Sequence, residues 1–192
     1  DLVKLARFAG ARLILGAAEH IDTHARQVHV AGRPPIAYDV AAINLGITSA
    51  MPDMAGFKDH AIPAKPLGVF ASKWQAFASQ ANPGPVVILG GGVAGAELAM
   101  ACAHRLDGGD ITLIDRGEIL EEFGVKSRGT LMGALTGLGI KLREGSQVVE
   151  IASDHVVLQD GETLASAFTI GAAGAKPQDW LADTGLALEQ GF

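Results

Sequence analysis

The spacing of apolar residues changes in the middle of the chain. Up to about residue 80 the apolar residues form short, interrupted clusters, whereas after residue 85 they form longer runs that alternate with helical stretches. A segment of turn-forming residues, Ala81-Asn82-Pro83-Gly84-Pro85, separates the two patterns. We therefore predict a domain boundary here, with residues 81–85 as the linker.

The pattern after the linker predicts alternating strands and helices. The uninterrupted apolar run at 85–90 is typical of a parallel strand that is buried on both faces. Two helices and two further strands are expected at 95–106, 126–138, 110–115 and 140–143. Three more strands, joined by tight turns, are expected at 147–152, 155–159 and 167–172. The fold class indicated is α/β, with a parallel sheet followed by a three-stranded antiparallel meander.

The first eighty residues predict smaller elements. We expect the end of a helix at 1–9 and short strands at 12–16, 18–22, 27–30 and 40–45. Phe70, Trp74 and Phe77 recur at helical spacing and predict a helix over 69–79.

A weak internal repeat links the two parts of the chain. Residues 10–52 and 139–177 share an order: a glycine, a short strand, a pair of meander strands, and an apolar strand that ends in glycine before a proline. Two copies of one arrangement suggest two related domains, and only the second copy follows a visible strand–helix–strand unit.

Composition narrows the class of protein. The chain of 192 residues is 48% hydrophobic and 19% charged, as in soluble globular proteins. Its net charge of −6 argues against binding to nucleic acid or to anionic lipid. No apolar run reaches the roughly 18 residues of a membrane span. We expect a cytoplasmic protein, with peripheral attachment to a membrane as the alternative for a longer protein.

Neither the cysteine nor the histidines predict catalytic or metal-binding chemistry. The single cysteine, Cys102, excludes an internal disulfide and lies in an apolar helical stretch, where we expect it to be buried. The six histidines form no metal-binding motif; His20 and His24 are four residues apart, but their surroundings predict strand and turn. We therefore predict no metal site.

A glycine fingerprint, Gly90-x-Gly92-x-x-Gly95, carries the functional prediction. Chance alone gives on the order of 0.4 such matches in a chain this rich in glycine. The glycine spacing by itself is therefore weak evidence for a dinucleotide site. Their context is stronger, because the motif follows an apolar strand and opens a helix. An acid, Asp115, ends the next strand about twenty residues further on, as in dinucleotide-binding domains.

Each residue of the fingerprint has a physical role in a dinucleotide site. Gly90 permits the tight turn, Gly92 lets backbone amides approach a pyrophosphate, and Gly95 lets the helix pack closely on the strand. The helix that follows offers free N–H groups and a positive dipole end to the phosphates. The candidate cofactor-binding residues in this turn are Gly90, Gly91, Gly92, Val93, Ala94 and Gly95.

The residues at 115 and 116 bear on the choice of cofactor. Asp115 can accept hydrogen bonds from ribose hydroxyls and would repel a 2′-phosphate, whereas the adjacent Arg116 would tolerate one. We favour NADH over NADPH. Glu97 lies in the first helical turn, and spacing alone leaves two readings of it equal: compensation of the helix dipole, or a catalytic position near the nicotinamide.

These motifs, in this order, resemble the FAD-dependent pyridine nucleotide-disulfide oxidoreductases that have two dinucleotide-binding domains. Residues 38–46, continued by Pro52 and Gly56, resemble the first closing motif of that family, residues 88–99 with Asp115 its NAD head, and residues 169–177 its second closing motif. The resemblance implies a Rossmann-like NAD(P)-binding domain inserted in an incomplete FAD-binding domain. The implied divisions are 1–80 partial FAD-binding domain, 81–85 linker, 86–174 NAD(P)H-binding domain and 175–192 return segment.

Lys65-Pro66, Phe70 and Trp74, with no cysteine pair, are more similar to the type II NADH dehydrogenase-like branch than to the disulfide reductases. The resemblance implies that Glu97 approaches the contact between nicotinamide and flavin, and that Gly174 lies beside the nicotinamide. It implies hydride transfer from NAD(P)H to FAD and then to a small acceptor such as a quinone, with a homodimer as one possible assembly.

The chain also departs from the family pattern. The first FAD-binding glycine motif, the later Gly-Asp motif and the C-terminal domain have no counterpart in the sequence. We expect a fragment that lacks most of its affinity for FAD and is inactive alone. The alternative function is a dinucleotide-binding module without catalysis, either regulatory, fused to another enzyme, or truncated.

Overall fold

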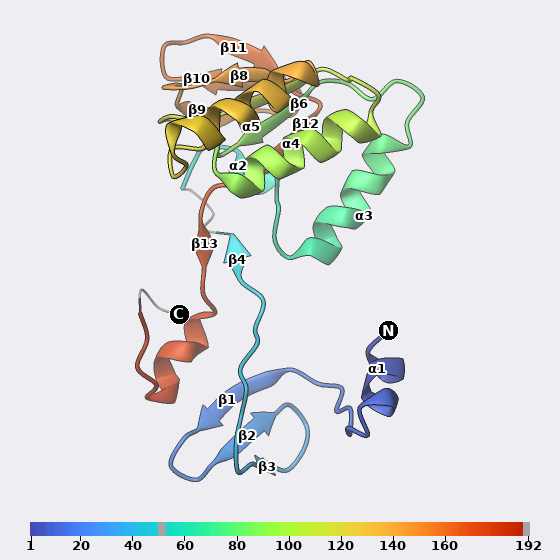
Figure 1. Cartoon of the computed structure of the whole chain (residues 1–192), viewed down its shortest axis with the longest axis vertical. Helices are drawn as coiled ribbons and strands as arrows, with labels where there is room; N and C mark the ends of the chain where they lie inside the picture. The colour runs from blue at the N-terminus through green and yellow to red at the C-terminus, as the bar shows by residue number, and fades with distance from the viewer. Residues whose placement is uncertain (50–52, 190–192) are drawn as a thin grey trace. The chain divides into compact units, whose positions relative to one another are not determined.

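The computed structural model describes residues 1–49 and 53–189 (Figure 1). The chain divides into two compact units, one formed by residues 47–176 and the other by residues 1–46 together with 177–192. The larger unit is therefore a continuous segment inserted into the smaller one. The sequence also predicts an insertion, but with the inserted domain at 86–174, so the larger unit begins well before the predicted one.

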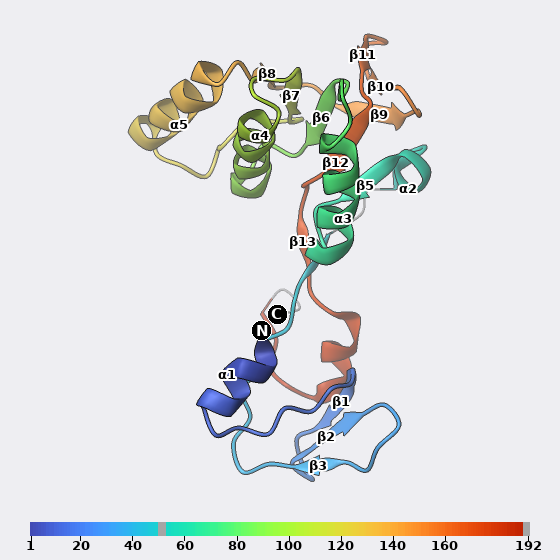
Figure 2. The same ribbon diagram turned by 90° about the vertical axis from the view of Figure 1, so that its right-hand side faces the viewer.

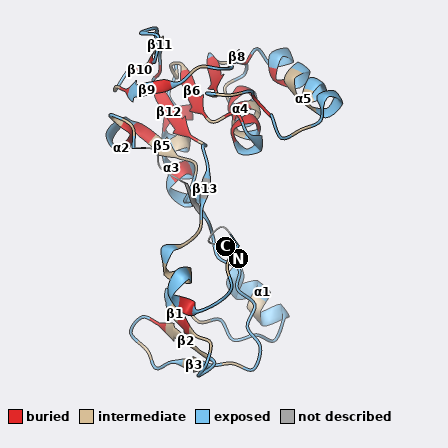
Figure 3. Ribbon diagram, turned by 90° about the vertical axis from the view of Figure 1, so that its left-hand side faces the viewer, coloured by how far each residue is buried: buried red, intermediate tan, exposed pale blue. Residues whose placement is uncertain are grey.

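A five-stranded sheet forms the centre of the larger unit. Its strands lie in the order β5 (Ala61–Pro63), β12 (Phe168–Gly171), β6 (Val86–Leu89), β7 (Ile111–Ile114) and β8 (Lys141–Arg143). Every neighbouring pair is parallel. All four residues of β6, β7 and β12 are buried (Figure 3). Burial on both faces explains the continuous apolar run of β6 and the mostly apolar sequences of β7 and β12.

Helices pack on one face of this sheet. They are α3 (Leu67–Ala78), α4 (Val93–Arg105) and α5 (Val125–Gly137). Residues at alternate positions of the strands, such as Ile88 and Leu113, join one hydrophobic cluster with side chains from these helices. The residues that α4 buries are small (Gly95, Ala96, Ala99, Cys102 and Ala103), and small residues let a helix lie close to a sheet.

The antiparallel meander joins the other hydrophobic cluster. It consists of β9 (Val148–Ile151), β10 (His155–Leu158) and β11 (Thr163–Ala165). Val87, Leu89 and Ile114 of the sheet cluster with apolar residues of this meander and with Phe57 of α2 (Phe57–His60). The parallel sheet thus lies between a helical layer and a meander (Figure 2).

Two short strands mark where the chain enters and leaves the larger unit. β4 (Thr48–Ser49) pairs antiparallel with β13 (Ala175–Lys176). This pairing joins the two ends of the inserted segment.

The smaller unit contains α1 (Leu2–Phe8), a sheet of β1 (Ala18–Asp22), β2 (Gln27–Val30) and β3 (Ile36–Ala37), and a 3-10 helix, η1 (Asp179–Thr184). The Asp1 carboxylate caps α1 by accepting from the N–H groups of Val3 and Lys4. Among the described residues of this unit, Ile21 and Val30 are the only buried hydrophobic side chains. The unit therefore has a very small core.

Two predicted strands are wrong. Residues 12–16 and 40–45 adopt no regular strand, and no described strand pairs with either. An apolar run of strand-like composition needs a neighbouring strand to satisfy its backbone groups, and these segments have none. Pro52, part of the predicted closing motif, lies outside the described residues.

The structure also differs from the predicted linker. Residues 81–85 lie inside the larger unit, because β5 and α3 precede them and pack on the same sheet. The meander is confirmed, but its third strand is β11, and the predicted strand at 167–172 is instead β12, which lies between β5 and β6 in the parallel sheet.

Candidate functional site

The glycine turn joins β6 to α4 at the carboxyl edge of the parallel sheet. Gly90 has φ +111°, and a Cβ at this position would lie 2.9 Å from the backbone nitrogen of Ala173. A Cβ on Gly95 would lie 1.8 Å from the carbonyl oxygen of Gly90. Only glycine fits at these two positions, and the result is a helix that begins directly against the end of the strand.

Asp115, at the end of β7, holds this turn in place. Its Oδ2 accepts a hydrogen bond of 2.6 Å from the N–H of Gly91, and its Oδ1 accepts one of 2.7 Å from the N–H of Gly117. A carboxylate has about four acceptor positions, so each oxygen keeps capacity for a further donor. Asp115 can therefore anchor the turn and still accept from ribose hydroxyls.

The segment after β7 packs against the glycine turn. Leu120 donates its N–H to the carbonyl of Gly91 at 2.8 Å, and both Ile119 and Leu120 are fully buried. Leu120 has φ +57°, an unfavourable conformation for a leucine. Glu144 and Arg128 hold the segment from outside: Ile119 donates to the Glu144 carboxylate and accepts from the Arg128 guanidinium, each at 2.7 Å.

Glu122 reaches the beginning of α4. Its Oε1 accepts a hydrogen bond of 3.3 Å from the N–H of Val93, the first residue of the helix. Free N–H groups at a helix N-terminus attract anions, and this carboxylate occupies one of them.

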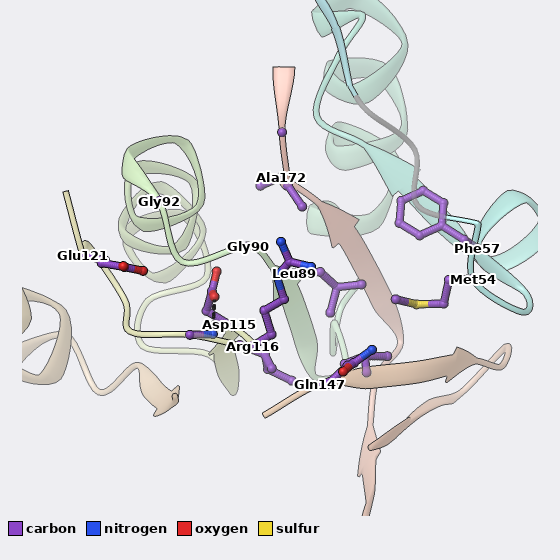
Figure 4. A pocket seen from close by; sticks show the side chains of 15 residues that line it. Met54, Phe57, Leu89, Gly90, Gly92, Asp115, Arg116, Glu121, Gln147 and Ala172 are labelled. Atoms are coloured by element: carbon purple, nitrogen blue, oxygen red, sulfur yellow. Dashed lines mark hydrogen bonds between the residues drawn. The ribbon is translucent and has the colours of Figure 1, made fainter. Parts of the chain in front are cut away.

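A cavity of about 600 Å³ opens between the carboxyl ends of β6, β7 and β12 and the start of the meander (Figure 4). This volume is in the range of small-molecule sites. Carboxylates of Asp115 and Glu121 lie on one side of it, and the apolar side chains of Met54 and Phe57 lie on the other. The full lining is Met54, Phe57, Leu89, Gly90, Gly92, Ile114, Asp115, Arg116, Gly117, Glu121, Gln147, Val148, Ala172, Ala173 and Gly174.

The structure brings five of the residues predicted from the sequence to this cavity: Gly90, Gly92, Asp115, Arg116 and Gly174. The other predicted residues of the turn lie beside it, in two groups. Gly91 and Gly95 are buried and shape the turn, whereas Val93 and Ala94 are exposed in the first turn of α4.

Glu97 is exposed on α4 and does not line the cavity. Its catalytic role stays a prediction.

Sequence reasoning missed the far wall of the cavity. Phe57 is 2% exposed and lies so close to Gly171 that a Cβ there would be 2.3 Å from its ring. The run of small residues that follows Gly171, Ala172-Ala173-Gly174, is the sequence signal that could have indicated this close approach. Met54 and Gln147 come from loops whose position depends on the tertiary fold.

No group of three or more His, Cys, Asp or Glu side chains among residues 1–49 and 53–189 is arranged to hold a metal ion. In the same part of the chain, no helix has the length and apolar character needed to cross a membrane.

Comparison with known proteins agrees with this architecture. The chain is 31% identical over 134 residues to demethylphylloquinone reductase NdbB of Synechocystis sp., an alignment that covers 67% of this chain and 33% of that protein. The chain therefore spans about a third of the length of this curated relative.

Solved structures share the fold. A FAD-dependent pyridine nucleotide-disulphide oxidoreductase from Desulfovibrio vulgaris is 27% identical, with a TM-score of 0.75 over 94% of this chain and 48% of that one. A ferredoxin reductase from Rhodopseudomonas palustris is 21% identical, with a TM-score of 0.83 over 97% of this chain and 47% of that one.

The family described as pyridine nucleotide-disulphide oxidoreductase matches residues 6–192, which is nearly the whole chain. The parallel sheet with its glycine turn, the antiparallel meander, and the insertion of one unit in the other are the features that the sequence predicts for this family. The chain belongs to the pyridine nucleotide-disulphide oxidoreductase family.

Proposed function

We propose that the larger unit binds NADH and presents it as electron donor in an FAD-dependent oxidoreductase. The observation that carries the proposal is the cavity in which the glycine turn, the start of α4 and the carboxylate of Asp115 meet. Ligands of open α/β sheets bind at the carboxyl ends of the strands, where this cavity lies.

The residues present fit a dinucleotide. Gly90 and Gly92 have no side chains, so a ligand can approach the backbone of the turn closely. The N–H groups at the start of α4 would hold the pyrophosphate. Asp115 would accept from the adenosine ribose hydroxyls with the acceptor positions that Gly91 and Gly117 leave free.

The opposite wall suits the nicotinamide end. Ala172, Ala173 and Gly174 follow β12 and present backbone with little side chain, and Met54 and Phe57 make the wall apolar. These residues would position a planar ring and keep water from it. The nicotinamide supplies the hydride, and the chain supplies orientation. We propose that Gly174 lies beside the nicotinamide, and that Glu97, which is on α4 outside the cavity lining, approaches it from the helix.

The proposals for the flavin and for the electron acceptor rest on membership of the family. We infer that the smaller unit belongs to an FAD-binding domain, and that the complete protein passes hydride from NADH to FAD and then to a quinone. The relative from Synechocystis sp. is named as a reductase of a quinone, and this supports the choice of acceptor. It also supports the type II NADH dehydrogenase-like branch.

The small core of the smaller unit favours a second candidate function for this chain by itself. With Ile21 and Val30 as its buried hydrophobic side chains among the described residues, this unit offers little to hold a flavin. The second candidate is a dinucleotide-binding module that does not catalyse electron transfer.

Two measurements on the 192-residue chain test these proposals. Isothermal titration calorimetry with NADH and with 5′-ADP should show one binding site for each; absence of heat with both ligands would contradict the NADH site. The absorption spectrum of the purified chain should show no stoichiometric flavin if the chain is a binding module. Bound flavin that NADH bleaches would instead identify an active oxidoreductase.

A further inference from the structure

A second acid, Glu121, faces the same cavity as Asp115. Both residues line it, with their side chains on the same side (Figure 4). One oxygen of each carboxylate, Oδ1 of Asp115 and Oε2 of Glu121, lies 3.5 Å from the point that a Cβ on Gly117 would occupy. The two oxygens are therefore within twice that distance of each other.

The backbone immediately before Glu121 is anchored, and the Glu121 side chain itself is exposed. The preceding residue, Leu120, is buried and bonded through its N–H to the carbonyl of Gly91. Its left-handed conformation turns the chain immediately before Glu121. Non-glycine residues in this conformation often occur at functional sites, where the surrounding structure maintains the strain.

We propose that Glu121 is a second residue that selects NADH over NADPH, acting with Asp115 to repel the 2′-phosphate of the adenosine ribose. This inference rests on the proposed function, because it takes the ribose to be held by Asp115. A 2′-phosphate replaces one of the hydroxyls that Asp115 would bind, so the added negative charge enters the space between the two carboxylates.

Glu121 also bears on the choice between NADH and NADPH, which the opposite charges of Asp115 and Arg116 leave open. The Arg116 side chain lines the cavity, is exposed, and forms no ion pair within the described part of the chain. Alone, its positive charge would balance that of Asp115 and leave the site tolerant of a 2′-phosphate. With Glu121 the cavity has two negative groups against one positive group, and the balance favours the unphosphorylated ribose.

The test compares 5′-AMP with 2′,5′-ADP (adenosine 2′,5′-bisphosphate), which differ only in the 2′-phosphate. We measure both by calorimetry at low salt, about 50 mM, because screening weakens interactions between exposed charges. Glu121→Gln should raise the affinity for 2′,5′-ADP about five- to tenfold, the effect of one charge on a phosphate several ångströms away in a water-like dielectric. The affinity for 5′-AMP should not change.

Two matched variants on the same segment separate this effect from a general change in charge. Glu118→Gln removes the same charge, but Glu118 does not line the cavity and is paired with Arg128 at 3.4 Å, so we expect no change with either ligand. Glu122→Gln removes a carboxylate bonded to the N–H of Val93, where the pyrophosphate would bind. This variant should raise the affinity for both ligands by the same factor.

The ratio of the two affinities decides the outcome. If Glu121→Gln leaves the ratio unchanged, either with no effect or with equal gains for both ligands, Glu121 does not select against the 2′-phosphate. If the unmodified chain binds neither 5′-AMP nor NADH, the proposed function itself fails. Normal binding of 5′-AMP with an unchanged ratio contradicts the inference about Glu121 alone.

Discussion

The carboxylate of Asp115 accepts a 2.6 Å hydrogen bond from the backbone N–H of Gly91. This bond joins the end of β7 to the glycine turn after β6, so the acid that would recognise the ribose also fixes the turn that would bind the phosphates. The two functions of the site are therefore linked through one side chain.

The close packing of α4 on the turn predicts a large effect of Gly95→Ala. The new Cβ would lie 1.8 Å from the carbonyl oxygen of Gly90, so the helix must move away from the strand. We expect a loss of about 1–3 kcal/mol in the free energy of unfolding, measured with urea. We also expect weaker NADH binding, because the turn is displaced.

Gly133→Ala is the matched control for this variant. Gly133 lies inside α5, and nothing is within 4 Å of the position of a new Cβ. We expect a gain of about 0.5–1 kcal/mol from the higher helix propensity of alanine. Equal effects of the two substitutions would contradict the close approach at Gly95.

Arg128 supports the segment that carries Glu121 and Glu122. Its side chain donates to the carbonyl of Ile119 and to the carboxylate of Glu144, which in turn accepts from the N–H of Ile119. Arg128→Ala should destabilise the larger unit by about 1–3 kcal/mol, since it removes hydrogen bonds of a charged group. It should also weaken NADH binding, which calorimetry would detect.

Lys141→Ala is the comparison for Arg128. Lys141 pairs with Asp110 at 2.8 Å, but both side chains are largely exposed, and such pairs contribute less than about 1 kcal/mol. If both variants left stability and NADH affinity unchanged, the support attributed to Arg128 would be absent.

Burial raises the pKa of the Cys102 thiol from its ordinary value of 9.0 to about 12. The folded protein should therefore react slowly with iodoacetamide at pH 8, and the unfolded protein rapidly, because the thiolate is the reactive form. Above pH 9 the unfolded chain loses a proton that the folded chain retains, so this group makes the fold less stable as the pH rises from about 9 to 12. Fast alkylation of the folded protein at pH 8 would contradict the burial of Cys102.

The sequence predicts the parallel strands β6, β7 and β8 well, but it misses β5 and predicts the smaller unit poorly. The difference has a physical reason. Apolar runs such as Val86–Leu89 are buried on both faces, so their pattern is explicit in the sequence. The runs at 12–16 and 40–45 are also rich in apolar residues, but they find no neighbouring strand among the described residues. Composition predicts that a segment can form a strand, and pairing decides whether it does.

The residues of the candidate site also fall into two groups, those that a local sequence pattern predicts and those that only the tertiary fold brings to the cavity. Glycines with a fixed spacing and an acid about twenty residues later are visible in the sequence, so Gly90, Gly92 and Asp115 could be predicted. Glu121 and Phe57 reach the cavity only through tertiary contacts, the first through Leu120 and the second against Gly171. No local pattern reports such contacts.

The most direct test of the dinucleotide site is the NADH affinity of the Asp115→Asn variant, measured by calorimetry against the unmodified chain. The amide keeps the size of the carboxylate but loses its charge and one acceptor group, so we expect NADH to bind at least tenfold more weakly, about 1.4 kcal/mol. A urea unfolding curve of each protein separates this effect from loss of the Gly91 bond. NADH binding of unchanged affinity in a folded Asp115→Asn variant would contradict the assignment of Asp115 to the ribose, and with it the proposed site.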